Sequence, residues 1–113
     1  MRRRMMKSKV HRATVTGAEL DYAGSISLDT ELMKRADILE FEQVAVLDID
    51  NGNRFETYAI AGHPGQVQLN GAAARLVEVG HRVIVITYAD YDDAELDRFE
   101  PLVVKVDAEN RPV

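Results

Sequence analysis

Short β-type segments, each closed by turn residues, constrain the fold of this chain more than any other feature. The run 83–88 is almost wholly apolar, and the runs 43–48 and 54–61 are separated by the turn Asp50-Asn51-Gly52. Asn-Gly between two such runs is a strong hairpin signal. We expect strands at 5–16, 43–48, 54–61, 67–69, 83–88 and 102–106.

Helical signals are few and short. Asp29 is a plausible N-cap for a helix that ends near Arg35-Ala36 and buries one apolar face. Asn70-Gly71 leads into a helical turn at 72–76, and a capped helix begins at Asp92 and is closed before Pro101. Segment 19–28 carries no clear pattern, and we expect the tail 107–113 to be loose. Six short strands with two or three short helices in 113 residues predict one mainly β domain, a closed or nearly closed β-barrel.

Composition excludes several kinds of protein. The chain has no cysteine, which rules out disulfides, thiolate metal sites and a Cys nucleophile, and we expect no metal. A net charge of −5 disfavours a nucleic-acid partner, and we interpret the basic cluster Arg2-Arg3-Arg4 as a solvated end. No apolar run approaches the ~20 residues of a membrane span or forms the core of a secretion signal. We expect a soluble, cytoplasmic protein without a membrane partner.

Four segments together resemble the bacterial aspartate 1-decarboxylase family, whose members are pyruvoyl-dependent. They match in order and spacing between about Met5 and Tyr88, and they are KSKVHRATVT at 7–16, LDYAGS at 20–25, NGNRFETYAI at 51–60 and NGAAA at 70–74. One departure is His81, because family members often carry an acidic residue after the glycine of Val79-Gly80. That position is not one of the family's catalytic positions.

The resemblance implies a six-stranded double-psi β-barrel over residues 1–113 and a homotetramer. It implies autocatalytic cleavage at Gly24-Ser25 into a β chain, 1–24, and an α chain, 25–113. Ser25 then becomes a pyruvoyl group, the family's cofactor, which forms a Schiff base with L-aspartate. The implied reaction yields β-alanine and CO₂ for pantothenate and coenzyme A biosynthesis.

The resemblance also assigns residue roles. Ser25 carries the pyruvoyl group, Tyr58 is the proton donor, and Gly24, Ser25 and Thr57 serve self-processing. The positions matching substrate-binding residues are Lys9, Arg54, Thr57, Asn70, Gly71, Ala72 and Ala73, and His11 and Tyr22 match supporting positions.

The chemistry of these residue types agrees with those roles. A peptide bond is hard to break, but a serine hydroxyl directly after it can attack the preceding carbonyl and shift the acyl group from nitrogen to oxygen. Gly24, which has no Cβ, accepts strained dihedrals at that point. The phenol of Tyr58 is protonated at pH 7, and Lys9 and Arg54 can neutralise the carboxylates of aspartate, Arg54 through two parallel hydrogen bonds.

Strand alternation raises a conflict at 54–58. Arg54 and Tyr58 share one face of a regular strand, while Thr57 points the other way. Either a bulge lies near Glu56-Thr57, or the site lies between subunits. The tetramer of the family favours the second, with Lys9, Arg54 and Tyr58 not all from the chain that supplies Ser25.

Two other functions remain open from sequence. The same machinery can decarboxylate another acidic amino acid, since pocket size is not readable here. Alternatively, Gly24-Ser25 is an ordinary turn in a non-catalytic β-barrel that binds partners. The intact set of Lys9, Ser25, Arg54 and Tyr58 disfavours this last alternative.

Overall fold

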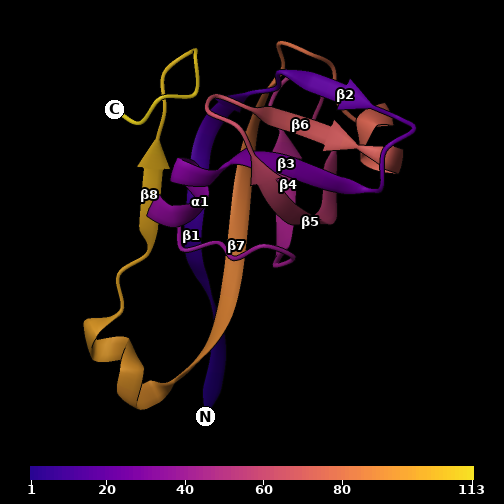
Figure 1. The fold of residues 1–113 in the computed structure, drawn as a ribbon. Coiled ribbons are helices and arrows are strands. Elements are labelled where there is room, and N and C mark those ends of the chain that lie inside the picture. Colours follow the sequence, from indigo (N-terminus) through magenta and orange to yellow (C-terminus); the bar gives the residue numbers. More distant parts are fainter.

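The computed structural model describes all residues from 1 to 113 and shows one mainly β domain (Figure 1). Eight strands form one sheet in the order β2-β6-β3-β5-β4-β7-β1-β8. The strands are β1 (Arg2–Thr14), β2 (Gly17–Glu19), β3 (Ser25–Asp29), β4 (Gln43–Asp48), β5 (Arg54–Gly62), β6 (Val67–Asn70), β7 (Arg82–Asp92) and β8 (Leu102–Lys105). The helices are α1 (Thr30–Arg35) and the two 3₁₀ turns η1 (Gly71–Arg75) and η2 (Asp93–Arg98).

The sheet closes on itself where β1 runs into β2. Val15 donates its backbone N–H to the carbonyl of His81, the residue before β7 (2.8 Å), and Thr16 donates to the carbonyl of Val67 in β6 (2.8 Å). β1 and β2 therefore form one bent strand of the barrel, which lies between β7 and β6; we call each strand position around the barrel a stave. β8 pairs with β1 and lies outside the ring. The ring has six staves, which agrees with the small β-barrel expected from the sequence.

Alternating side chains fill the barrel. β4 and β7 point valines inward at every second position, and β3 and β6 do the same with Ile26, Leu28, Val67 and Leu69, all fully buried. Helix α1 packs Leu32 and Met33 into the core and contacts β3, β5 and β8. Its N-cap is Asp29, as expected, and the side chain accepts from the Glu31 N–H at 2.7 Å.

Several boundaries differ from the sequence-based expectations. β1 begins at Arg2, since Arg3 and Arg4 pair with Asp93 and Asp90 beside β7, so the basic cluster is exposed but part of a strand. β2 and β3 lie in the segment where no strand was expected. The barrel's sixth stave is thus β3, whereas the expected last strand, β8, lies outside the ring.

The expectation of a loose tail is wrong. Val106 and Pro112 form a β-bridge, and Asn110 is 1% exposed. Its side chain accepts from Thr14 N–H at 2.7 Å and donates to the Thr14 and Gly65 carbonyls at 2.8 and 2.9 Å. The tail is therefore fastened to the end of β1.

Candidate functional site

Ser25 opens β3 and is completely buried, although Gly24 before it is exposed. Its Oγ donates to the Ala23 carbonyl at 2.9 Å, which turns the hydroxyl back toward the segment before Gly24. The same Oγ accepts from Asn70 Nδ2 at 3.0 Å. The hydroxyl at the Gly24-Ser25 junction is therefore held by one acceptor and one donor, both within the chain.

The turn after β6 packs directly against this junction. Gly71 has φ of +66°, and a Cβ added there would lie 2.7 Å from the Gly24 Cα and 3.1 Å from the Tyr22 carbonyl oxygen. Any other residue would push the junction away. Gly24 itself has no positive φ and room for a Cβ, so the glycine that the geometry requires is Gly71.

Of the four residues of NGAA, Asn70 and Ala73 are buried, Gly71 is half-buried and Ala72 is exposed. The expected substrate loop is thus the same segment that contacts the serine. Tyr22 is 53% exposed, and its backbone rather than its ring lies near Gly71.

The pairing of β5 rules out one of the two explanations offered for residues 54–58, the bulge. β4 and β5 pair without a register shift, from Leu47 opposite Arg54 to Gln43 opposite Tyr58. No bulge therefore exists at Glu56-Thr57. Thr57 lies opposite the buried Val44 and points inward without a side-chain hydrogen bond, whereas Arg54 and Tyr58 point outward.

Tyr58 lies close to the serine along the sheet. β3 and β5 are parallel with Ile26 opposite Ala59, so the preceding pair in register is Ser25 and Tyr58. The Tyr58 ring is half-buried and contacts Phe41, with ring centroids 6.2 Å apart. The structure therefore brings Ser25 and Tyr58 to neighbouring strands.

The two expected cations lie elsewhere on the outer face. Lys9 stands in one cross-strand row with Ile86, Ala45 and Glu56, on the far side of β7 and β4 from β5. Neither Lys9 nor Arg54 forms a salt bridge or side-chain hydrogen bond within the chain. Both cations are available to an anionic ligand.

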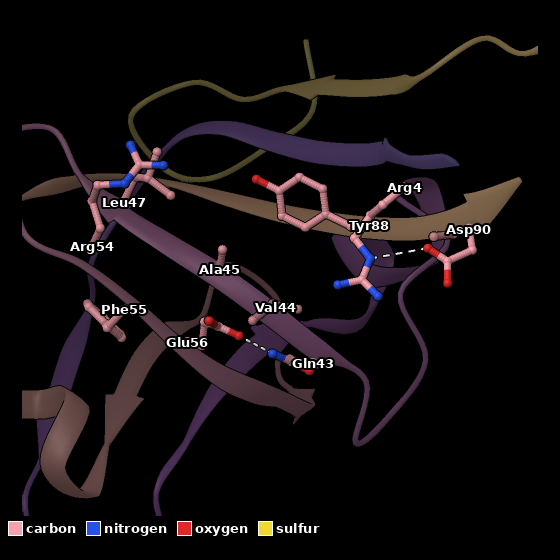
Figure 2. Close-up of a pocket in the computed structure, with 11 residues that line it drawn as sticks. Arg4, Gln43, Val44, Ala45, Leu47, Arg54, Phe55, Glu56, Tyr88 and Asp90 are labelled. Atoms are coloured by element: carbon pink, nitrogen blue, oxygen red, sulfur yellow. Dashed lines mark hydrogen bonds and ion pairs between the residues drawn. The ribbon is translucent and has the colours of Figure 1, made fainter. Parts of the chain in front are cut away.

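Arg54 lines a hollow of about 810 Å³ on the outer face of β4, β5 and β7 (Figure 2). Leu47 lies beside Arg54 at one end, Tyr88 points over the middle, and Arg4 pairs with Asp90 at the other end. The volume is within the range of ligand pockets. Ser25 is not part of this hollow, so one chain does not bring the serine and all of its expected partners together.

His11 follows Lys9 on β1, before a register shift where Arg12 has φ of +64°. Its Nδ1 is buried without a hydrogen-bond partner. Burial, with the positive charges of Lys9, Arg12 and Lys105, lowers its pKa below the usual value. His11 is therefore neutral at pH 7 and adds no charge to the site.

Sequence reasoning missed two polar residues that contact Asn70. Ser27 Oγ accepts from Asn70 Nδ2 at 3.0 Å, and Gln68 Nε2 donates to Asn70 Oδ1 at 2.8 Å. The signal was present in the alternation of SISLD and QVQLN, in which every second residue is polar.

No helix in the chain has the length and apolarity needed to cross a membrane.

These features define a class: a small β-barrel protein with a buried serine directly after Gly24 and unpaired cations on its outer face. Comparison with known proteins places it further. The whole chain, residues 1–113, matches the family described as aspartate decarboxylase. The chain belongs to that family.

Relatives carry the same description. Aspartate 1-decarboxylase of Clostridium botulinum strain 657 is 56% identical over 108 residues, covering 94% of this chain and 85% of that protein. Aspartate 1-decarboxylase of Syntrophobacter fumaroxidans is 54% identical over 115 residues, covering 100% and 93%. The resemblance noted in the four sequence segments is confirmed.

Proposed function

We propose that this protein decarboxylates L-aspartate to β-alanine and CO₂, as a cytoplasmic step toward pantothenate, after cutting itself between Gly24 and Ser25. The observation that carries the proposal is the buried Ser25 hydroxyl, held by Asn70 and folded back over Gly24 onto the Ala23 carbonyl. Family membership supports aspartate as the substrate. An ordinary surface turn would not bury this serine or pack a glycine with positive φ against it.

The residues present fit the formation of a pyruvoyl group at position 25. Ser25 Oγ attacks the Gly24 carbonyl carbon while its proton passes to the Ser25 nitrogen, so the C–N bond breaks as a C–O ester bond forms. Loss of the Cα proton of residue 25 then breaks the Cβ–Oγ bond and releases the Gly24 carboxylate. Water replaces the nitrogen of the resulting enamine as ammonia, leaving a ketone.

Donors near these atoms can stabilise the charge that develops during the cut. The Asn70 amide donates to Oγ, where charge grows as the proton leaves and again when the Cβ–Oγ bond breaks. Thr57 is the family's candidate for the oxyanion of the first step. Because it points inward and has no hydrogen bond to the junction, that role requires a movement of the junction or of Thr57.

The pyruvoyl group would supply a carbonyl that attaches the amine of aspartate and withdraws the electrons left by CO₂. Residues of the chain itself bind the substrate and return a proton to its α-carbon. Tyr58, next to Ser25 in register, holds a phenolic proton for the α-carbon. Arg54 and Lys9 bind the two carboxylates, and Arg54 fixes orientation through its planar fork.

Lys9 and Ser25 lie on strands that do not pair within one chain: β6 stands between β1 and β3 on one side of the ring, and β5, β4 and β7 stand between them on the other. Lys9 belongs to the outer-face row with Ile86, Ala45 and Glu56, whereas Ser25 is buried at the start of β3, and no side-chain contact joins the two residues. We therefore propose a homotetramer in which Lys9 comes from a neighbouring subunit, with the outer face of β4, β5 and β7 at the contact.

Mixing two inactive variants tests both the site and its division between chains. Ser25→Ala and Lys9→Ala should each lack activity as pure proteins. When the two are coexpressed, about a quarter of the sites in randomly mixed assemblies receive Ser25 and Lys9 intact, from different chains. Activity near a quarter of the wild-type value supports a site shared between chains. A mixed preparation without activity would place both residues in one chain.

The choice of substrate needs a separate assay. Wild-type protein is given L-aspartate or L-glutamate at equal concentration, and released CO₂ is measured. We expect release from aspartate only. Faster release from glutamate would favour the alternative, a decarboxylase of another acidic amino acid, and release from neither would favour a binding module.

A further inference from the structure

A chain of hydrogen bonds runs in one direction along β6 and ends on the reactive serine. The His63 N–H donates to Gln66 Oε1 at 3.0 Å, and Gln66 Nε2 donates to Gln68 Oε1 at 3.4 Å. Gln68 Nε2 donates to Asn70 Oδ1 at 2.8 Å, and Asn70 Nδ2 donates to Ser25 Oγ at 3.0 Å. Each carboxamide thus accepts from the one before it and donates to the next, and we call residues 66, 68 and 70 the amide chain.

The β-strand period places these amides side by side. Gln66, Gln68 and Asn70 lie at every second position, while Val67 and Leu69 between them enter the core. The antiparallel partner β3 sets Ser27 opposite Gln68 and Ser25 opposite Asn70, so the polar residues of both strands share one face.

Two glycines make room for the side chains of the amide chain, because neither has a Cβ. A Cβ at Gly17 would lie 2.7 Å from Gln68 Oε1, and a Cβ at Gly62 would lie 2.7 Å from Gln66 Oε1. Gly17 lies directly opposite Gln68 on the parallel strand β2. Its φ is not positive, so at this position the missing side chain matters for space and not for backbone conformation.

The neighbours of Asn70 decide which end of its carboxamide faces the serine. A carboxamide has one accepting and one donating end, and a half-turn exchanges them. Gln68 offers a donor, so the oxygen of Asn70 must face it, while Ser27 Oγ takes the second proton of Nδ2. Asn70 is fully buried, so no solvent competes for either end.

We propose that Gln68, assisted by Ser27, is a positioning residue for self-cleavage: it holds the Asn70 carboxamide with its amino end on Ser25 Oγ. The inference rests on the proposed cut between Gly24 and Ser25. The aligned donor polarises Oγ both when its proton leaves and when the Cβ–Oγ bond breaks. If the carboxamide turns over, Ser25 instead donates to Asn70 Oδ1, and that assistance is lost.

Replacing the hydrogen-bond donor at position 68 with an acceptor tests this orientation of the Asn70 carboxamide. In Gln68→Glu the introduced carboxylate only accepts, so Asn70 must turn its amino end toward it and away from Ser25. We expect cleavage at pH 7 to slow by about tenfold or more, the effect of misplacing one aligned donor. Below about pH 4.5 the carboxyl is protonated and donates again, so the rate relative to wild type should recover.

The measurement is a time course of the full-length chain made by cell-free synthesis. Intact mass under denaturing conditions gives the fraction still joined at Gly24-Ser25 at each pH. Dilute samples are used, because the net charge of −5 falls in magnitude as carboxylates protonate at low pH. A protein with little net charge associates and precipitates more readily. Thr30→Glu, which adds one carboxylate at an exposed position of α1, is the control and should follow wild type at both pH values.

Each outcome bears on a different claim. If wild type never cleaves, the proposed self-cleavage itself fails. If wild type cleaves and Gln68→Glu keeps pace with it at pH 7, or is slow without recovery in acid, the positioning role is overturned. Recovery in acid in the same folded sample supports the role, because misfolding would not be reversed by protonating one side chain.

A second variant displaces part of the amide chain without changing any of its residues. Gly17→Ala places a methyl group where the Gln68 carboxamide lies, and the flexible end of Gln68 can move aside without disturbing the backbone. We expect cleavage to slow several-fold at every pH, with an unchanged far-UV circular dichroism spectrum. Cleavage at the wild-type rate would show that the position of the Gln68 carboxamide is irrelevant.

Discussion

At the scale of single residues, the account depends on which polar atoms meet at position 25. The resemblance to a known family assigned roles to the serine, the asparagine and the tyrosine, and their residue types suit the chemistry. Sequence reasoning missed Ser27 and Gln68, since one strand of five residues and another of four give weak alternation signals. Contacts between β3 and β6, some 45 residues apart, are set by the fold and not by local pattern.

Replacing the phenol of Tyr58 should separate self-cleavage from decarboxylation. Tyr58→Phe keeps the ring contact with Phe41 but loses the transferable proton, so we expect decarboxylation to fall by about 10²–10⁴-fold. Cleavage at Gly24-Ser25 should proceed normally, because the phenol makes no hydrogen bond to the junction. Intact mass and CO₂ release are measured on the same sample.

Tyr91→Phe provides the control for this prediction. Tyr91 lies far along β7, where its ring packs edge-on against Phe99 at 5.0 Å, and loss of its hydroxyl should leave both readouts unchanged. Full decarboxylase activity in Tyr58→Phe would remove Tyr58 from the mechanism.

His81, the position that departs from the family pattern, makes stability depend on pH. Its Nδ1 lies 2.7 Å from Asp48 Oδ2, and that hydrogen bond raises the pKa of His81 above its usual value of about 6.5. A raised pKa in the folded state stabilises the protein fully below pH ~6.5, and the gain is lost as pH rises through the folded-state pKa. Urea unfolding of wild type and His81→Gln should therefore differ more at pH 6 than at pH 9.

His63 is the natural control, because it lies exposed in the loop after β5 without a carboxylate partner. At pH 6, His63→Gln should change stability less than His81→Gln does, because His63 has no ion pair to lose. A difference for His81→Gln that is constant or grows with pH would contradict the ion pair with Asp48.

At the scale of elements, the strands with strong alternation or apolar runs were predictable, and the strands made by pairing were not. β4, β5 and β7 follow from β-branched residues and the Asn-Gly turn. β2 has three residues and exists because Thr16 bends the chain onto β6. β1 extends to Arg2 only because acidic residues of β7 and η2 lie opposite its arginines.

Asp29 joins two elements, so its loss should cost more than a helix cap alone. One oxygen caps α1 through Glu31 N–H, and the other accepts from Gly65 N–H at 2.8 Å in the loop before β6. We expect Asp29→Ala to lower the free energy of unfolding by about 2–3 kcal/mol in denaturant titration. Asp29→Asn keeps the cap and loses the loop contact, so it should cost about half as much; equal costs would contradict the two-contact description.

At the scale of the whole molecule, the sequence predicted a small barrel but not its closure or its fastened tail. Asn110 reaches Thr14, 96 residues earlier, and no local pattern reveals such a contact. Ring closure likewise depends on one bent stave pairing on both sides. The proposed division of the site between subunits fits this shape, because β1 and β3 are not neighbouring strands of the ring.

The central claim is that the chain cuts itself and turns its new end into a ketone. Denaturing intact-mass measurement of purified, active protein, with and without hydroxylamine, tests it most directly. We predict two species, residues 1–24 and 25–113, with the longer one lacking a free amino terminus and gaining mass with hydroxylamine. An active preparation that consists of a single uncut species of 113 residues, unreactive toward hydroxylamine, would contradict it.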